Sequence, residues 1–144
     1  MRVVRLLITV AILALLPSVS SAWCFDEAAA RFKVDARLLR DIALIESGMQ
    51  PNAVGVNKDG SEDIGVMQIN SSWLTKLGRY EITRQDLFDP CVNVHVGAWV
   101  LAHNIAQYGA TWRAVGAYNA RSEAKREAYV QKVWAVRKKR ERQS

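Results

Sequence analysis

Residues 35–70 read DARLLRDIALIESGMQPNAVGVNKDGSEDIGVMQIN, and the first part of this stretch predicts an amphipathic helix. Asp35 is a typical residue for the start of a helix, and Gly48 is a typical residue for its end. Glu46 therefore lies in the last turn of the predicted helix. The apolar residues that recur on one face of it are Leu38, Leu39, Ile42, Ala43 and Ile45.

The composition changes after this helix. Residues 49–64 are rich in Pro, Asn, Gly and Asp, which favours turns, and Lys58-Asp59-Gly60 indicates a small hairpin. Because the segment follows the helix directly, we expect the hairpin to lie beside Glu46.

Helical patterns continue on both sides of the stretch. They predict short helices over residues 25–32, from Ser71 or Ser72 to Leu77 and over residues 112–118, a long helix from Asp89-Pro90 to Tyr108, and a last helix capped by Ser122. The predicted fold class is mainly α (α+β), with a small hairpin region beside a cleft. We expect one compact domain over residues 23–121 and a basic C-terminal helix over residues 122–144.

The N-terminus has the pattern of a cleavable export signal. Arg2 and Arg5 form a positive start, residues 6–16 form an apolar run, and Ser20 and Ala22 occupy the positions that determine cleavage. The run is shorter than the roughly 20 residues that a bilayer core requires. We therefore expect a periplasmic protein of one domain, without stable membrane insertion.

Cys24 and Cys91 are the only two cysteines. An exported chain meets oxidising conditions, so a disulfide between them is expected. Lipidation of Cys24 is an alternative, although Trp23 stands where lipoprotein signals carry a small residue. His95 and His103 have no further ligand at a recognisable spacing, and no metal or cofactor is predicted.

The charge is moderately positive. The formal net charge of +6 suits a polyanionic surface such as a bacterial envelope. The run Arg137-Lys138-Lys139-Arg140 is either a solvated helix end or a contact with envelope polymer, lipid or a partner protein. The basic residues do not gather on a recognition helix, so no nucleic-acid partner is expected.

Glu46 follows three apolar residues, Ala43-Leu44-Ile45. Burial among such neighbours would raise the pKa of the carboxyl toward the range that a general acid needs near neutral pH. The alternative is a glutamate that points to solvent at the end of the helix.

Two further motifs carry amide side chains. In residues 65–70, GVMQIN, alternation would place Gln68 and Asn70 on one side of an extended segment and the apolar residues in the core. Amides suit sugar hydroxyl and N-acetyl groups, since they donate and accept hydrogen bonds. In Ala117-Tyr118-Asn119, the tyrosine either hydrogen-bonds a carboxyl or is a core aromatic residue.

The order of these motifs, with Asn93 and Gly97 in a helix between them, resembles the lysozyme-like soluble lytic transglycosylase family. The resemblance extends from Cys24 to Asn119. The small size, export signal, single cysteine pair and stretch DGSEDIGVMQIN look like the branch that accompanies type III secretion, conjugation or pilus machineries. The implied partners are peptidoglycan glycan strands and components of a type III or type IV secretion or pilus machine.

The resemblance implies roles for individual residues. Glu46 would be the catalytic acid and base, supported by Ser47 at the helix end. The residues that would line the glycan cleft are Gly65, Met67, Gln68 and Asn70. The pair that would face the catalytic carboxyl is Tyr118 and Asn119, and Tyr118 would be a catalytic residue. Asn93 would be structural. Arg121 departs from the family pattern, which often has Gly there, and this puts the local turn in question.

The implied reaction is cleavage of the β-1,4 bond between N-acetylmuramic acid and N-acetylglucosamine by one carboxyl, giving 1,6-anhydromuramoyl ends without a cofactor. A lysozyme-type muramidase is an alternative because hydrolysis normally uses a second carboxylate. Glu62 and Asp63 are candidates for it, and Asp63 is favoured since Ile64-Gly65 follows directly. A non-catalytic glycan-binding assembly protein is the second alternative.

Overall fold

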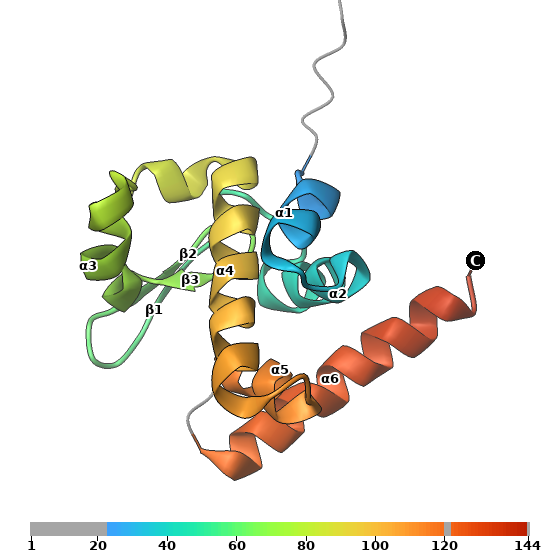
Figure 1. Ribbon diagram of the computed structural model, residues 1–144. Coiled ribbons are helices and arrows are strands. Elements are labelled where there is room, and N and C mark those ends of the chain that lie inside the picture. The colour runs from blue at the N-terminus through green and yellow to red at the C-terminus, as the bar shows by residue number, and fades with distance from the viewer. Residues whose placement is uncertain (1–22, 120–121, 144) are drawn as a thin grey trace, which may run out of the picture.

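The computed structural model describes residues 23–119 and 122–143, so the predicted export signal and Arg121 lie outside the described residues. The helices are α1 (Phe25–Phe32), α2 (Ala36–Ser47), α3 (Leu74–Leu77), α4 (Pro90–Tyr108), α5 (Trp112–Asn119) and α6 (Glu123–Glu141), with 3-10 turns η1 (Ser71–Trp73), η2 (Gly78–Tyr80) and η3 (Asp86–Phe88). Strands β1 (Val54–Val56), β2 (Glu62–Ile64) and β3 (Ile69–Asn70) form an antiparallel sheet in that order. The expected mainly helical fold with a small hairpin region is confirmed (Figure 1).

Both ends of α2 are fixed as the sequence predicted. The Asp35 carboxylate accepts a hydrogen bond from the Leu38 N–H at 2.9 Å. Gly48 ends the helix in the left-handed conformation, with φ 61°, and its N–H donates to the Leu44 carbonyl at 3.0 Å. These two ends set the register that places Glu46 in the last turn.

Helix α4 runs through the middle of the molecule. The sheet and α3 lie on one side of it and α1 and α2 on the other (Figure 1). Asp89 caps the helix by accepting from the Val92 N–H at 2.9 Å, and Pro90 begins it. Because neighbours cover several of its sides, buried residues occur around much of its circumference, including Val94, Val96, Ala98, Val100 and Leu101.

Residues 65–68 form turns, so the extended segment that alternation predicted is wrong at this point. Gly65 and Gln68 both have positive φ angles, 77° and 49°, which curl the chain before β3. The predicted burial pattern holds in spite of the turn, because Met67 and Ile69 are buried.

Two of the predicted caps differ from expectation. Asn70 caps the turn that follows β3, accepting from the Ser72 N–H at 3.0 Å, where Ser71 or Ser72 was expected. Ser71 instead accepts from the Glu62 N–H at 3.0 Å. At the start of α6, Ser122 is the N-cap residue but its side chain makes no capping hydrogen bond.

Cys24 and Cys91 form the expected disulfide. It joins the residue before α1 to the first turn of α4, so it links the beginning of the described chain to the central helix. A disulfide leaves Cys24 without a thiol for lipidation. His95 lies beside the bridge, and its Nδ1 is 2.9 Å from the Cys91 carbonyl oxygen.

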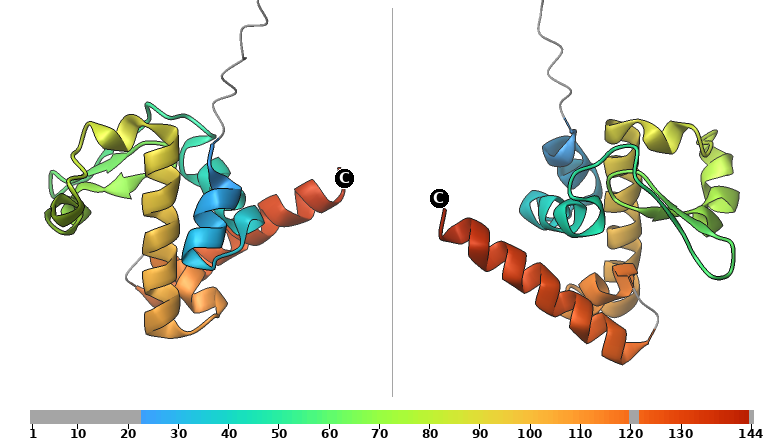
Figure 2. Two further views of the ribbon diagram at one scale, coloured as in Figure 1. Left: turned by 45° about the horizontal axis from the view of Figure 1, so that its top comes forward. Right: turned by 180° about the vertical axis from the view of Figure 1, so that it is seen from behind.

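Helix α6 packs on α5 and α2 and then extends beyond them (Figures 1 and 2). Asp41 of α2 is 1% exposed and accepts from Arg140 at 2.6 Å and from Arg137 at 3.2 Å. Two members of the basic run therefore hold α6 on the helix that carries Glu46.

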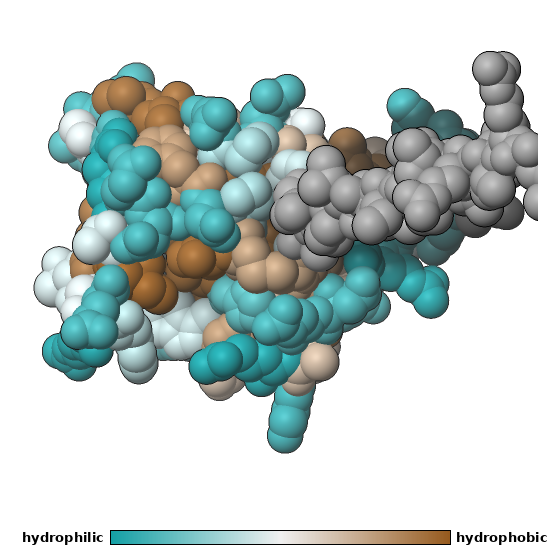
Figure 3. Space-filling model, turned by 90° about the horizontal axis from the view of Figure 1, so that it is seen from above, coloured by the Kyte–Doolittle hydropathy of each residue, from teal (hydrophilic) through white to brown (hydrophobic). Residues whose placement is uncertain are grey.

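The face shown in Figure 3 is mainly hydrophilic, with hydrophobic residues in small separate patches. In the part of the chain that the structure describes, the large hydrophobic side chains that are exposed are Leu44, Val54, Val56 and Tyr80. Within residues 23–119 and 122–143, no helix combines the length and apolar character that crossing a membrane requires.

Candidate active site

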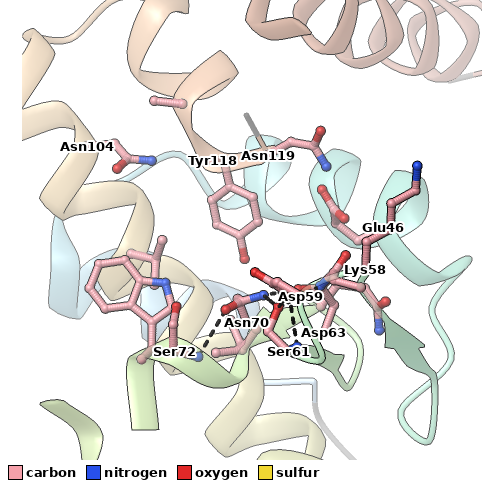
Figure 4. Close-up of a pocket in the computed structure, with 16 residues that line it drawn as sticks. Glu46, Lys58, Asp59, Ser61, Asp63, Asn70, Ser72, Asn104, Tyr118 and Asn119 are labelled. Carbon is pink, nitrogen blue, oxygen red and sulfur yellow. Dashed lines mark hydrogen bonds between the residues drawn. The ribbon is translucent and has the colours of Figure 1, made fainter. Parts of the chain in front are cut away.

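A cleft of about 760 Å³ lies between the β1–β2 hairpin, α4 and α5. It is lined mostly by polar side chains, and Figure 4 shows them converging from these elements. Six residues proposed from the sequence line this cleft: Glu46, Asp63, Gln68, Asn70, Tyr118 and Asn119. The whole lining comes from four segments far apart in the chain: Glu46 at the end of α2, residues 57–73, residues 100–104 of α4 and residues 117–119 of α5.

Glu46 is the partly buried carboxyl of the cleft. Its Oε1 accepts a hydrogen bond from the Tyr129 hydroxyl at 2.5 Å. The pKa of Glu46 is raised to about 7. Burial is the largest cause; the hydrogen bond from Tyr129 lowers the pKa, the negative charge of Asp63 raises it, and Asn119 and Lys132 lower it. Because burial is the largest effect, the carboxyl holds its proton up to about neutral pH, as a general acid requires. Glu46 is thus partly buried, although Leu44, one of its apolar neighbours in the sequence, is 45% exposed.

Asp63 lies on β2 and is held through both carboxylate oxygens. Oδ1 accepts from the Asn70 amide at 2.8 Å and Oδ2 from the Asn57 amide at 2.9 Å. The same two amides donate to the Ser61 hydroxyl oxygen at 3.1 Å. This network, drawn in Figure 4, fixes the orientation of Asp63.

Glu62 faces away from this network. Its carboxylate forms two hydrogen bonds with Arg84, at 2.7 and 2.8 Å, and it does not line the cleft. Neighbouring side chains on a strand point to opposite faces, which explains why only Asp63 of this acidic pair reaches the site.

Gln68 and Asn70 both line the cleft, but their amides make different contacts. The Gln68 amide nitrogen donates to the Gly65 carbonyl at 2.9 Å and to the Ala53 carbonyl at 3.2 Å. Its amide therefore stabilises the turn as well as facing the cleft. Asn70 orients Asp63, as described above.

The cleft is not lined by Gly65, Met67 or Ser47. These residues lie behind its surface and hold the loop of residues 65–68 in place. A Cβ on Gly65 would lie 2.2 Å from the Asn93 amide nitrogen. Asn93 is fully buried and binds the loop, accepting from the Met67 N–H at 2.7 Å. Ser47 donates to the Val66 carbonyl at 2.8 Å, which ties the end of α2 to the same loop.

Tyr118 fits neither of the two roles that the sequence allowed, a hydrogen bond to a carboxyl or a plain core aromatic residue, completely. Its ring packs against the core and lines the cleft, while its hydroxyl donates to the Met67 carbonyl at 2.9 Å. Burial, followed by the charges of Glu46 and Asp63, raises the pKa of Tyr118 well above its usual value, so the phenol stays neutral. Its hydrogen bond goes to the loop and not to the Glu46 carboxyl.

Tyr129, which hydrogen-bonds Glu46, is not among the residues that the sequence motifs single out. It is 3% exposed, and a buried tyrosine hydroxyl normally has a partner. That rule signals that some acceptor lies opposite Tyr129, but the acceptor is 83 residues away in the sequence, so its identity depends on how α6 packs.

The helical fold with a small sheet beside a polar cleft, and the partly buried glutamate at a helix end whose pKa is raised to about 7, are typical of lysozyme-like enzymes. Residues 23–140 match the family described as Transglycosylase SLT domain, and the chain belongs to this family. It is accordingly a peptidoglycan lytic transglycosylase. The match includes most of α6, in agreement with the contribution of this helix to the site.

The similar proteins include proteins of enteric bacteria. The chain is 43% identical over 124 residues to Invasion protein IagB of Salmonella typhimurium, covering 81% of this chain and 78% of that protein. It is 39% identical over 116 residues to Protein IpgF of Shigella flexneri, covering 80% and 76%. An inactive mutant of the lytic transglycosylase Slt from Pseudomonas aeruginosa has the same fold, with a TM-score of 0.64 and 21% identity over 83% of this chain and 23% of that chain.

Proposed function

We propose that the enzyme cleaves the β-1,4 bond between N-acetylmuramic acid and N-acetylglucosamine and leaves 1,6-anhydromuramoyl ends. The observation that carries the proposal is Glu46, whose pKa is raised to about 7 by burial and which is hydrogen-bonded by Tyr129 in the cleft. One carboxyl with such a pKa can donate a proton and then accept one at neutral pH.

The reaction proceeds in two proton transfers. Protonated Glu46 donates to the glycosidic oxygen as the bond to the muramoyl C1 breaks, and the acetamido oxygen of the substrate bonds to C1. The Glu46 carboxylate then takes the proton of the 6-hydroxyl, whose oxygen attacks C1 and displaces the acetamido oxygen. The ring closes without water, and Glu46 regains its proton.

Asp63 gives this site a second carboxylate. Its negative charge raises the pKa of Glu46 and would stabilise positive charge that develops at the sugar ring. A held carboxylate in the cleft also favours a second candidate, a muramidase in which Asp63 assists attack by water. The two reactions differ in their products.

Mass spectrometry of the muropeptides that the purified protein releases from sacculi separates these candidates. We expect anhydro ends from the wild type, no release from Glu46→Gln, and reduced release from Asp63→Asn. Glu62→Gln is the matched control, because Glu62 lies outside the cleft, and its release should equal that of the wild type. Reducing ends from the wild type would identify a muramidase, and unchanged release by Glu46→Gln would move catalysis to another residue.

We further propose that the enzyme works in the periplasm, opening the wall locally for a secretion, conjugation or pilus machine. The N-terminal signal pattern, the disulfide and the similarity to a protein named for invasion support this. Fractionation of cells checks the location: the mature chain should appear in the periplasmic fraction with its N-terminus at Trp23. Retention in the cytoplasm would contradict it.

A further inference from the structure

Asn104 lies on α4 and lines the cleft on the side of Tyr118 away from Glu46 (Figure 4). The residue is 7% exposed. Its amide nitrogen is buried and has no hydrogen-bond partner among residues 23–119 and 122–143. Buried amide donors are nearly always paired, and leaving one unpaired costs free energy. A ligand acceptor at this end of the cleft would remove that cost.

The surroundings of Asn104 are apolar and aromatic. Val100 lies one turn earlier on α4 and also lines the cleft, as does Trp73. The Trp73 ring packs edge-on against Trp99 and His103, with centroid distances of 5.2 and 5.8 Å. Trp99 and His103 adjoin Val100 and Asn104 in the helix, so Trp73 is held at the same end of the cleft.

Among residues 23–119 and 122–143, the charged groups of the cleft lie away from Asn104. Those that line the cleft are Glu46, Lys58, Asp59 and Asp63, and all of them come from the end of α2 or from the hairpin. A group that fits against Asn104 is therefore uncharged and combines a carbonyl acceptor with an apolar part. An acetamido group has this chemistry, since its oxygen accepts a hydrogen bond and its methyl group packs on Val100, while the Trp73 ring packs on the sugar ring itself.

We propose that Asn104, Trp73 and Val100 form a subsite for an N-acetylhexosamine residue beyond the bond that is cleaved, with the Asn104 amide donating to the acetamido oxygen. The proposal rests on the proposed function, because it assigns the far end of the same cleft. The buried nitrogen reaches the ligand by rotation of the terminal amide, a torsion with a broad energy minimum.

Titration calorimetry with Glu46→Gln protein, which does not consume its ligand, tests the subsite. The probes are a β-1,4 tetramer of N-acetylglucosamine and a β-1,4 tetramer of glucose, which lacks acetamido groups. Asn104→Leu should weaken binding of the first probe about tenfold or more and leave binding of the second unchanged. Trp73→Ala is the matched control and should weaken both, since its ring does not distinguish them.

Packing effects are separated by two further measurements. Asn104→Leu removes an unpaired buried donor, so its thermal midpoint should equal or exceed that of the parent. Asn104→Asp keeps the shape without the amide donor and should show the same selective loss. Equal weakening of both probes, or unchanged binding of the first, would overturn the subsite while muropeptide release remained. If neither probe binds and the wild type releases no muropeptides, the proposed function fails and the subsite with it.

Discussion

Glu46 is influenced by two neighbours that act on its pKa in opposite directions. The Tyr129 hydroxyl hydrogen-bonds the carboxylate and lowers the pKa, whereas the charge of Asp63 raises it. Only the protonated carboxyl donates to the leaving oxygen, so kcat/KM should fall as the pH rises through about 7.

Tyr129→Phe and Asp63→Asn should therefore move this fall in opposite directions. Loss of the Tyr129 donor raises the pKa of Glu46 and shifts the fall to higher pH. Loss of the Asp63 charge lowers the pKa and shifts the fall to lower pH. Profiles of kcat/KM against pH, together with a carbon NMR titration of the Glu46 carboxyl, measure both shifts. Movement in the same direction, or none, would contradict the assignment of the two neighbours.

At the scale of residues, the sequence singled out Glu46 and Asp63, which both line the cleft, but not the hydrogen-bond partner of Glu46. Glu46 and Asp63 could be found because local patterns mark them: an apolar helix before one and a glycine motif after the other. Tyr129 is linked to Glu46 only by the packing of α6, and a single sequence carries no local signal for such a contact.

The turn at residues 65–68 depends on one glycine. Gly65 has φ 77°, and an added Cβ would lie 2.2 Å from the Asn93 amide nitrogen and 2.5 Å from the Leu87 carbonyl oxygen. Gly65→Ala should lower the free energy of unfolding by about 2–4 kcal/mol, since both strain and overpacking result. Urea denaturation measures this change.

Gly60 provides the matched control for Gly65. It also has a positive φ, 81°, but a Cβ there meets no atom within 4 Å. Gly60→Ala should cost only the backbone strain, about 1–2 kcal/mol. Equal costs at the two positions would mean that the contact with Asn93 does not constrain the turn.

The attachment of α6 to α2 depends on Asp41, a buried carboxylate that accepts from two arginines. Asp41→Asn should lower the free energy of unfolding by about 2–3 kcal/mol, less than for a fully buried pair because Arg140 can rehydrate. It should also loosen Tyr129 from Glu46 and raise the pKa of the acid. Asp26→Asn, which breaks the 2.6 Å pair with Arg40 at the surface, should cost less than about 1 kcal/mol.

A destabilised Asp41→Asn protein with an unchanged pH profile would show that α6 stays in place without this contact. At the scale of elements, both ends of α2 and the start of α4 were well predicted because Asp35, Gly48 and Asp89 act through local hydrogen bonds. The turn at residues 65–68 was not predicted. Its alternation of polar and apolar residues is also typical of an extended strand, and the positive φ angles of Gly65 and Gln68 leave no mark in that pattern.

At the scale of the whole molecule, the disulfide joins residues 67 apart in the sequence. Closing a loop of this length contributes about 4 kcal/mol to the free energy of unfolding in the chain-entropy model. A double Cys24→Ser, Cys91→Ser variant should therefore unfold at lower urea concentration, with little loss of activity in the absence of denaturant, because the bridge lies away from the cleft. An unchanged midpoint would show that α1 is held on α4 by packing alone.

The overall architecture was predictable because the helices and the hairpin are marked by local sequence patterns. The disulfide between Cys24 and Cys91 then restricts how α1 and α4 can pack. The C-terminal limit of the domain has a weaker signal in the sequence. A boundary at residue 121 separates α6 from the rest in composition, since the helix is rich in charges, yet the family match continues to residue 140 and α6 packs on both α5 and α2.

The contact between Tyr129 and Glu46 has a consequence for the order of events in a newly made chain. Synthesis runs from the N-terminus, so Glu46 is made well before Tyr129, which lies 83 residues further along the chain. The surroundings that set the pKa of Glu46 are therefore complete only after α6 has packed on α2 and α5.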